Sequence, residues 1–159
     1  AMGARIRLIG DGDVAGALMT SLPGHETADL LLGIGGSPEA VITACAMKCL
    51  GSNMQCQPYF RNEDDKIRAN ERGLTQDSIL TIDDLVKSDN VFFAAAGGSD
   101  GDLLKGVHYH GAHIATNSLC MRSSSGTIRF IDALHSQKKL MEMGGNIAYD
   151  PNIKEELGL

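Results

Sequence analysis

Residues 28–50, ADLLLGIGGSPEAVITACAMKCL, contain the most clearly defined structural unit of this sequence. The continuous apolar run at 28–34 is typical of a β-strand that is buried on both faces. Two glycines then predict a tight turn. Ser37 is a suitable N-cap and Pro38 suits the first helical position, so we expect a helix that ends at Gly51. A strand, a glycine turn and a capped helix in this order favour an α/β domain.

Further strands and helices are predicted on both sides of this unit. Alternating or continuous apolar runs predict strands at 5–9, 54–60, 90–96, 107–122 and 127–134. Helical patterns predict helices at 14–22, 62–72 and 81–86. We expect the last two strands to pair antiparallel through a turn at 123–126. The elements together predict a layered α/β domain with a mixed sheet over residues 1–136, followed by a weakly patterned tail at 137–159.

Composition excludes several classes of protein. The 159 residues include 43% apolar and 21% charged residues, which is typical of one globular domain or of a piece of a larger one. The net charge of −6 and the absence of Trp argue against nucleic acid as a partner. No apolar run approaches the roughly 18–20 residues that a membrane-spanning helix needs. We therefore expect neither a nucleic-acid nor a membrane partner.

The cysteines and the first residues indicate a compartment and a context. The four cysteines, at 45, 49, 56 and 120, form no CxxC pair and show no zinc-ribbon spacing. Free cysteines of this kind are typical of a reducing compartment, so we expect a cytoplasmic protein or one of an organelle stroma. The chain enters an apolar run within a few residues of Ala1 and shows no signal peptide, which is the appearance of the middle of a longer protein.

The first candidate site is Asp11-Gly12-Asp13, directly after the predicted strand at 5–9. Ligands of open α/β sheets bind at the carboxyl ends of strands. Two acidic side chains around a glycine can accept hydrogen bonds from sugar hydroxyls or hold a hard cation. The alternative is a plain turn in which an aspartate caps the next helix.

The second candidate site is the loop at 33–39. Its glycines allow a ligand to approach the backbone, and a helix N-terminus favours anions. Glu39 lies in the first helical turn, where it could bind Mg²⁺ or Mn²⁺ or could simply interact favourably with the helix dipole. The loop lacks the third glycine of a dinucleotide fingerprint and the lysine of a P-loop.

Three other features favour a structural interpretation. The glycine- and aspartate-rich loop at 97–102 follows a predicted strand, but such residues are common in turns. His108, His110 and His113 suggest a metal site, yet no cysteine or acid accompanies them at zinc spacing, so a partly exposed strand face is preferred. The serines at 123–125 lack the Gly-x-Ser-x-Gly context of a hydrolase nucleophile.

The residues at 9–15 and 33–41 resemble those of class II fructose-1,6-bisphosphatases, including the cyanobacterial type that also acts on sedoheptulose-1,7-bisphosphate. The resemblance is collinear from residue 5 to residue 136. Further matching stretches lie at 87–93, 101–104, 114–116 and 125–129.

This resemblance implies a metal-dependent sugar-bisphosphate phosphatase of carbohydrate metabolism, in gluconeogenesis or the Calvin cycle. Its fold would be related to that of inositol monophosphatase-like enzymes. By the family pattern, Asp11, Gly12, Asp13 and Gly36 would contact the sugar bisphosphate. Glu39 would be a ligand of Mn²⁺ or Mg²⁺. In such an enzyme a metal-activated water would release the 1-phosphate.

The resemblance covers only the C-terminal half of the family's chain. The first half carries the other metal carboxylates and an Asp-Pro-hydrophobic-acid-Gly-Thr segment. The only Asp-Pro here, at 150–151, does not fit that segment. We therefore expect no catalytic residue in this chain, no activity of the chain alone, and self-association into a homo-oligomer through uncovered surfaces. The alternatives are a non-catalytic module that binds sugar phosphates or anions and, more weakly, a nucleotide-binding domain.

Overall fold

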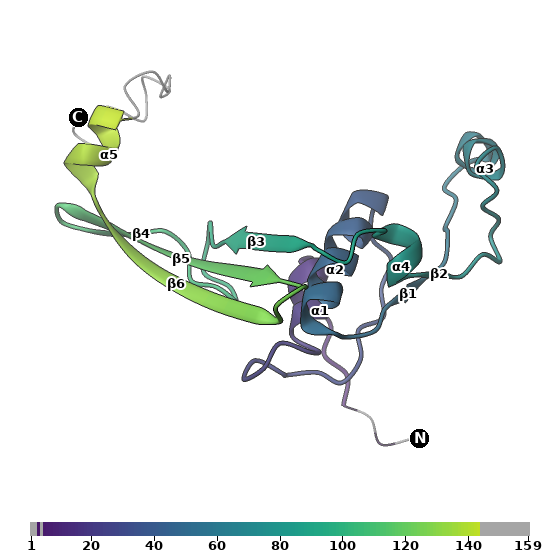
Figure 1. Cartoon of the computed structure of the whole chain (residues 1–159), viewed down its shortest axis with the longest axis horizontal. Helices are drawn as coiled ribbons and strands as arrows, with labels where there is room; N and C mark the ends of the chain where they lie inside the picture. The colour runs from purple at the N-terminus through teal and green to yellow at the C-terminus, as the bar shows by residue number, and fades with distance from the viewer. Residues whose placement is uncertain (1–2, 4, 144–159) are drawn as a thin grey trace. The chain divides into compact units, whose positions relative to one another are not determined.

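The computed structural model describes residue 3 and residues 5–143 (Figure 1). The chain divides into two compact units. Among the described residues, unit 1 contains residues up to 95 together with 119–130, and unit 2 contains 96–118 and 131–143. Helices and short strands alternate along unit 1, whereas unit 2 consists mainly of strands. The predicted α/β class is thus confirmed.

Unit 1 contains helices α1 to α4 and most of the buried hydrophobic residues. Its elements are α1 (Asp13–Leu18), α2 (Ser37–Leu50), β1 (Gln55–Cys56), α3 (Glu63–Asn70), β2 (Leu80–Thr81) and α4 (Ile82–Leu85). β1 and β2 pair antiparallel, with Gln55 opposite Thr81. The buried hydrophobic side chains of unit 1 are Ala17, Leu18, Met19, Leu22, Ala44, Ala46, Met47, Cys49, Val86, Val91, Phe93, Leu119 and Met121. The residues of α1 and α2 therefore supply much of the core.

Local signals set the ends of α2. Pro38 lies in the first turn, as predicted, and Gly51 ends the helix in the left-handed conformation with φ 65°. Glycine adopts this conformation without the steric cost that other residues carry. The N-cap is Gly36 rather than Ser37, and no side chain caps the helix. The helix N-terminus is therefore bordered by a glycine, which has no side chain to cap its first amide groups.

Lys48 connects α2 to the segment that contains α4. Its Nζ lies 2.9 Å from an Asp83 carboxylate oxygen and 3.1 Å from one of Asp89, and it donates a hydrogen bond of 3.0 Å to the carbonyl of Val86. The hydrogen bond to Asp83 is the largest of the effects that raise the pKa of Lys48. These contacts hold the helix against residues 83–89.

Two predicted strands of unit 1 are absent. Residues 5–9 and 28–34 are extended but form neither a strand nor a bridge with any described residue. The prediction that 28–34 is buried on both faces is wrong, because most of its side chains are exposed. A strand is defined by hydrogen bonds to a neighbouring strand, and these segments have no such neighbour in the described part of the chain.

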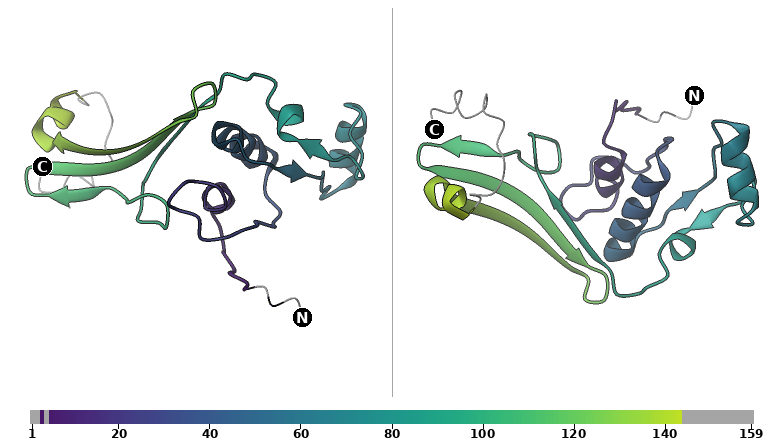
Figure 2. Two further views of the ribbon diagram at one scale, coloured as in Figure 1. Left: turned by 60° about the horizontal axis from the view of Figure 1, so that its bottom comes forward. Right: turned by 90° about the horizontal axis from the view of Figure 1, so that it is seen from above.

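The described residues also form a four-stranded sheet. Its strands are β3 (Phe92–Ala96), β4 (His108–His110), β5 (His113–Arg122) and β6 (Thr127–Ser136), in the order β3-β5-β4 with β6 also paired to β5. β5 and β6 lie side by side in all views (Figure 2). A turn at Gly111, with φ 59°, divides the single strand that we predicted at 107–122 into β4 and β5.

The pairings of this sheet run antiparallel. β4 and β5 are antiparallel, with His110 opposite His113. Hydrogen bonds join Val91 to Ser123 and Gly97 to Asn117, so β3 and β5 also run in opposite directions. We predicted a mixed sheet, but these pairings of the described strands are antiparallel.

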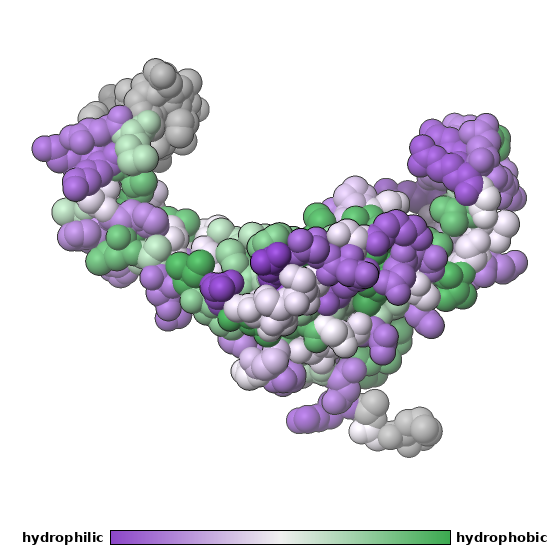
Figure 3. Space-filling model, viewed as in Figure 1, coloured by the Kyte–Doolittle hydropathy of each residue, from purple (hydrophilic) through white to green (hydrophobic). Residues whose placement is uncertain are grey.

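The end of the described chain contains one more helix, α5 (Gln137–Met143), where a weakly patterned tail was predicted. The remainder of that predicted tail, at 144–159, lies outside the described residues. None of the helices in the described part of the chain is long and apolar enough to cross a membrane. Hydrophobic residues reach the molecular surface in several places (Figure 3).

Candidate functional site

Asp13 and Gly35 meet in unit 1. Asp13 is the first residue of α1 and is half-buried. A Cβ atom added to Gly35 would collide with the Asp13 carboxylate. The carboxylate therefore occupies the space that a side chain at Gly35 would fill. The structure thus brings the Asp11-Gly12-Asp13 motif and the loop at 33–39 into contact.

Glu39 folds back over the other glycine of the loop. A Cβ atom added to Gly36 would collide with the Glu39 carboxylate. Glu39 is the third residue of α2, a position from which glutamate commonly reaches back toward the N-cap. Its placement is therefore compatible with the helix-dipole alternative and equally with a carboxylate presented to a ligand.

Two carboxylates consequently lie beside two consecutive glycines at the start of α2. Each carboxylate therefore lies against the same two-residue segment, Asp13 at Gly35 and Glu39 at Gly36. The backbone N–H groups of the first helical turn also point out of this end of the helix. The carboxylate oxygens can accept hydrogen bonds from hydroxyls or bind cations. The backbone N–H groups can donate hydrogen bonds to anions.

The other two residues of the first motif flank Asp13. Asp11 is exposed, and Gly12 is the N-cap of α1 with φ 76°. Gly12 has no side chain with which to cap α1, and Asp13 Oδ1 accepts a hydrogen bond of 3.2 Å from the Val14 amide in the first turn. Asp13 is therefore compatible with the alternative of a turn aspartate at the start of the helix and also with a ligand site. The structure places Asp13 beside Gly35 and Glu39 beside Gly36, and Asp11 and Gly12 precede Asp13 in the sequence.

The part of the chain that the structure describes holds an incomplete donor set for a metal ion. No group of three or more histidine, cysteine, aspartate or glutamate side chains among the described residues could hold a metal ion. Mg²⁺ requires near-octahedral coordination by oxygen atoms, several of them often from water. Glu39 can supply one such oxygen, but the described residues do not form a complete metal site.

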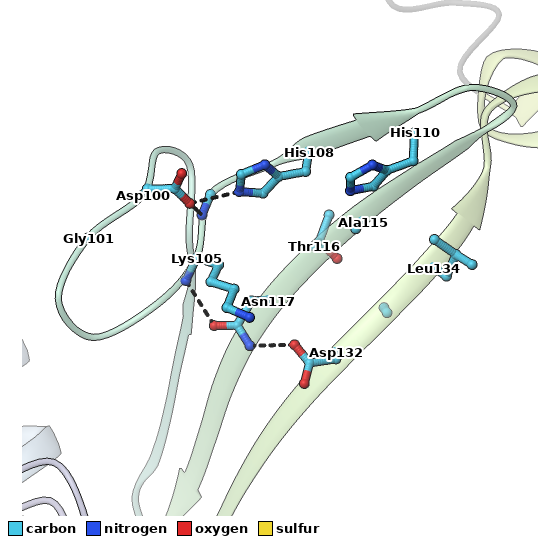
Figure 4. Close-up of a pocket in the computed structure, with 12 residues that line it drawn as sticks. Asp100, Gly101, Lys105, His108, His110, Ala115, Thr116, Asn117, Asp132 and Leu134 are labelled. Carbon is cyan, nitrogen blue, oxygen red and sulfur yellow. Dashed lines mark hydrogen bonds and ion pairs between the residues drawn. The ribbon is translucent and has the colours of Figure 1, made fainter.

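A second polar region lies in unit 2, in the loop between β3 and β4. The Asp100 carboxylate accepts hydrogen bonds of 2.8 Å from the Gly106 amide and 2.8 Å from His108 Nε2 (Figure 4). The Gly106 hydrogen bond, followed by that of His108, lowers the pKa of Asp100. These bonds close the loop on itself, which agrees with the structural interpretation of 97–102. The Asp100–His108 pair was not predicted from the sequence, because its partners are joined only once the loop folds.

This loop borders a pocket of about 700 Å³ formed by unit 2 alone. Asn117 accepts a hydrogen bond from the Lys105 amide at 3.1 Å and donates one to Asp132 at 2.9 Å (Figure 4). His110 and His113 are exposed on their strands. The histidines thus lie on a partly exposed strand face, as expected, and the polar groups of the pocket mostly hydrogen-bond to one another.

Comparison with known proteins identifies the family. The family model for bacterial fructose-1,6-bisphosphatase, glpX-encoded, matches residues 1–135. The chain belongs to this family. The resemblance drawn from residues 9–15 and 33–41 is thereby confirmed.

Curated relatives carry the corresponding names. The chain is 42% identical over 147 residues to the fructose-1,6-bisphosphatase class 2 of Haemophilus influenzae, a match that covers 84% of this chain and 44% of that protein. It is 35% identical over 148 residues to the D-fructose 1,6-bisphosphatase class 2/sedoheptulose 1,7-bisphosphatase of Gloeobacter violaceus, covering 84% of this chain and 42% of that protein. A Synechococcus protein of the same name is 35% identical over 146 residues, with the same coverage. The chain spans less than half the length of these relatives.

Proposed function

We propose that this chain is the C-terminal, substrate-binding half of a class II fructose-1,6-bisphosphatase. The whole enzyme would hydrolyse the 1-phosphate of fructose-1,6-bisphosphate and, in the cyanobacterial manner, that of sedoheptulose-1,7-bisphosphate. One observation carries the proposal: the carboxylates of Asp13 and Glu39 lie beside Gly35 and Gly36. The family's two most specific motifs therefore converge on one small region of this fold.

Each residue of this region has a proposed task. Asp11, Gly12 and Asp13 accept hydrogen bonds from, or lie against, the sugar hydroxyls. Gly36 leaves room for the substrate beside the start of α2. Glu39 supplies one ligand to Mn²⁺ or Mg²⁺, whose chemistry in such enzymes is to stabilise phosphoryl charge and to acidify the attacking water. The other metal ligands and the catalytic residues belong to the part of the enzyme that this chain does not match.

Four broader features belong to the same proposal. The complete fold would be that of inositol monophosphatase-like phosphatases. The enzyme would be a cytoplasmic or plastid-stromal homo-oligomer of gluconeogenesis or the Calvin cycle. Its partner would be a sugar bisphosphate, with no nucleic acid or membrane involved. The chain alone would be inactive, because an incomplete donor set cannot hold the metal in the required geometry.

Phosphate release tests the proposed activity. We compare the chain alone with a fusion protein in which the unmatched part of the Haemophilus influenzae relative precedes residue 5, using fructose-1,6-bisphosphate with Mn²⁺ or Mg²⁺. We expect activity only in the fusion protein, and its loss on Glu39→Gln. Full activity of the Glu39→Gln fusion protein would contradict the proposed metal role of this side chain.

A metal titration supplies a readout besides activity. Calorimetry should show Mn²⁺ binding to the fusion protein and at least about 100-fold weaker binding to the free chain, because one carboxylate cannot replace a full coordination sphere. Asp77→Asn, at an exposed position outside the site, serves as the control. Equal Mn²⁺ affinity of the two proteins would contradict the proposed division of ligands.

The incomplete donor set also favours a second candidate, a non-catalytic module that binds sugar phosphates or anions. Such a module would bind fructose-1,6-bisphosphate without metal, and Asp13→Asn would weaken that binding. The fusion protein would then release no phosphate. Metal-independent binding by the free chain together with an inactive fusion protein would select this candidate.

A further inference from the structure

Five aliphatic side chains are exposed on the segments 5–9 and 28–34 of unit 1. Ile6 and Leu8 are 84% and 91% exposed, and Leu30, Leu32 and Ile34 are 71%, 84% and 75% exposed. We call these five residues the aliphatic row. Large exposed apolar patches on soluble proteins mark surfaces that bind another polypeptide or a ligand.

The two segments that carry the aliphatic row meet at one glycine of α1. A Cβ atom added to the buried Gly16 would lie 3.0 Å from Ile9 Cδ1 and 3.4 Å from Leu31 Cδ1. Because both side chains reach the same point of the helix, the segments 5–9 and 28–34 lie next to each other there. No hydrogen-bonded ladder joins the two segments. We call them the strand-like layer, because both have the sequence pattern of strands and both contact α1 at Gly16.

This layer has one packed face and one bare face. Successive side chains of an extended chain point to opposite faces. Since Ile9 and Leu31 face α1, the neighbouring Leu8, Leu30 and Leu32 face away from it. Apolar residues on both faces are typical of strands that have a layer of structure on each side. The residues of the aliphatic row are therefore those of a strand layer that lacks its second cover.

We propose that the aliphatic row is the docking surface for the part of a class II fructose-1,6-bisphosphatase that this chain does not match. This inference rests on the proposed function and adds the interface. The relatives carry more than half of their length outside the match, since the matched part is 44% of the Haemophilus influenzae protein and 42% of the Gloeobacter violaceus protein. A polypeptide of that size can supply both a covering layer and strands to pair with the segments 5–9 and 28–34.

The position of the row relative to the candidate site favours this partner over a second copy. Residues 5–9 lead directly into Asp13, and residues 28–34 lead directly into Gly35 and Glu39. A polypeptide that covers the row therefore comes to lie beside the two carboxylates. The unmatched part of the enzyme would bring the missing metal ligands there, whereas a second copy would bring another incomplete set.

Co-purification tests the docking surface. The chain is co-expressed with the tagged unmatched part of the Haemophilus influenzae relative, and the captured complex is analysed by hydrogen exchange. We expect capture of the chain and protection of the amides at 5–9 and 28–34. Leu8→Asp and Leu32→Asp should each weaken capture about 10- to 100-fold, because each introduces a charge into a buried apolar contact.

Ile67→Asp is the matched control, because Ile67 is 53% exposed on α3, away from the row. It should be captured like the unsubstituted chain. Normal capture of both Leu8→Asp and Leu32→Asp would overturn the proposal. A complex in which the segments 5–9 and 28–34 stay unprotected would also overturn it. The same holds for a dimer of this chain that protects these segments and persists in the presence of the co-expressed partner.

The fusion protein gives a second measurement that does not require the partner to fold separately. Leu32→Asp should lower the thermal unfolding midpoint of the fusion protein and leave that of the free chain unchanged, since the side chain is already exposed there. Equal midpoints for the substituted and unsubstituted fusion proteins would overturn the proposal.

The two proposals fail in distinguishable ways. A fusion protein with a protected row but no phosphatase activity would refute the proposed function and retain the interface. An active fusion protein that tolerates Leu32→Asp in both its activity and its unfolding midpoint would refute the interface and retain the function.

Discussion

Gly35 and Gly36 matter because they lack a Cβ atom. Neither has the positive φ that would itself require glycine. A methyl group added to Gly35 would collide with the carboxylate of Asp13, and one added to Gly36 would collide with the carboxylate of Glu39. Both contacts are to the ends of flexible side chains, which can move aside at little cost. The two glycines therefore control the positions of the carboxylates more than the stability of the fold.

Gly35→Ala and Gly36→Ala should accordingly separate activity from stability. We expect each to lower phosphate release by the fusion protein about 10- to 100-fold, because small displacements of positioning groups have effects of this size. The free energy of unfolding of the free chain should change by no more than about 0.5 kcal/mol.

Gly33→Ala is the control for these two variants, because no atom lies within 4 Å of its added Cβ and its φ is not positive. It should leave both activity and stability unchanged. A loss of activity as large as that of Gly36→Ala would mean that chain flexibility, and not the space beside the carboxylates, is what these glycines provide.

Asp100 gives unit 2 a response to acid. Its pKa is lowered in the folded state by the Gly106 amide and by His108, so its contribution to stability is present above the unfolded-state value of about 3.9 and is lost as the pH falls through the lowered pKa. We expect the Gly106 amide resonance to titrate in that range, and Asp100→Asn to abolish the titration. Asp77→Asn should leave it intact, and an unchanged titration in Asp100→Asn would assign it to another group.

At the scale of elements, the helices could be predicted from the sequence because their signals are local. Asn62 caps α3 by accepting a hydrogen bond of 2.8 Å from the Asp65 amide, and Thr81 and Asp84 form a capping box on α4. Gly51 ends α2 through its left-handed conformation. Each of these signals lies within a few residues of the helix end that it determines.

The strands were predicted less well, because a strand depends on a partner that local sequence does not specify. The strand expected at 54–60 is reduced to Gln55–Cys56, where β2 is available for pairing. Residues 5–9 and 28–34 have the pattern of strands but no partner among the described residues. For the candidate site, the sequence motifs indicated the candidate residues. The contact of Asp13 with Gly35 could not be predicted, because it depends on how the chain folds between them.

Gly51→Ala tests how far one residue supports α2. An alanine in the left-handed conformation costs about 1–2 kcal/mol, so the free energy of unfolding should fall by that amount. Gly51→Asn should have a clearly smaller effect, because asparagine tolerates this conformation better. Urea denaturation measures both changes, and equal losses for the two variants would show that the conformation of residue 51 is not the cause.

At the scale of the whole molecule, the bare face of the strand-like layer should control association. Apolar side chains that water surrounds drive contact with other apolar surfaces, so the free chain should form dimers or larger species as its concentration rises. Sedimentation should detect them, and the double variant Leu8→Asp/Leu32→Asp should sediment as a smaller species. A monomeric chain at every concentration would contradict the expected self-association.

The same bare face has a consequence inside a living cell. Proteases and chaperones continuously remove proteins that expose apolar surface, and the abundance of a chain reflects how long it escapes them. A polypeptide whose aliphatic row stays uncovered would be removed quickly, whereas one in which the row is covered would persist. The abundance of the enzyme would therefore depend on whether the row is covered as the protein folds.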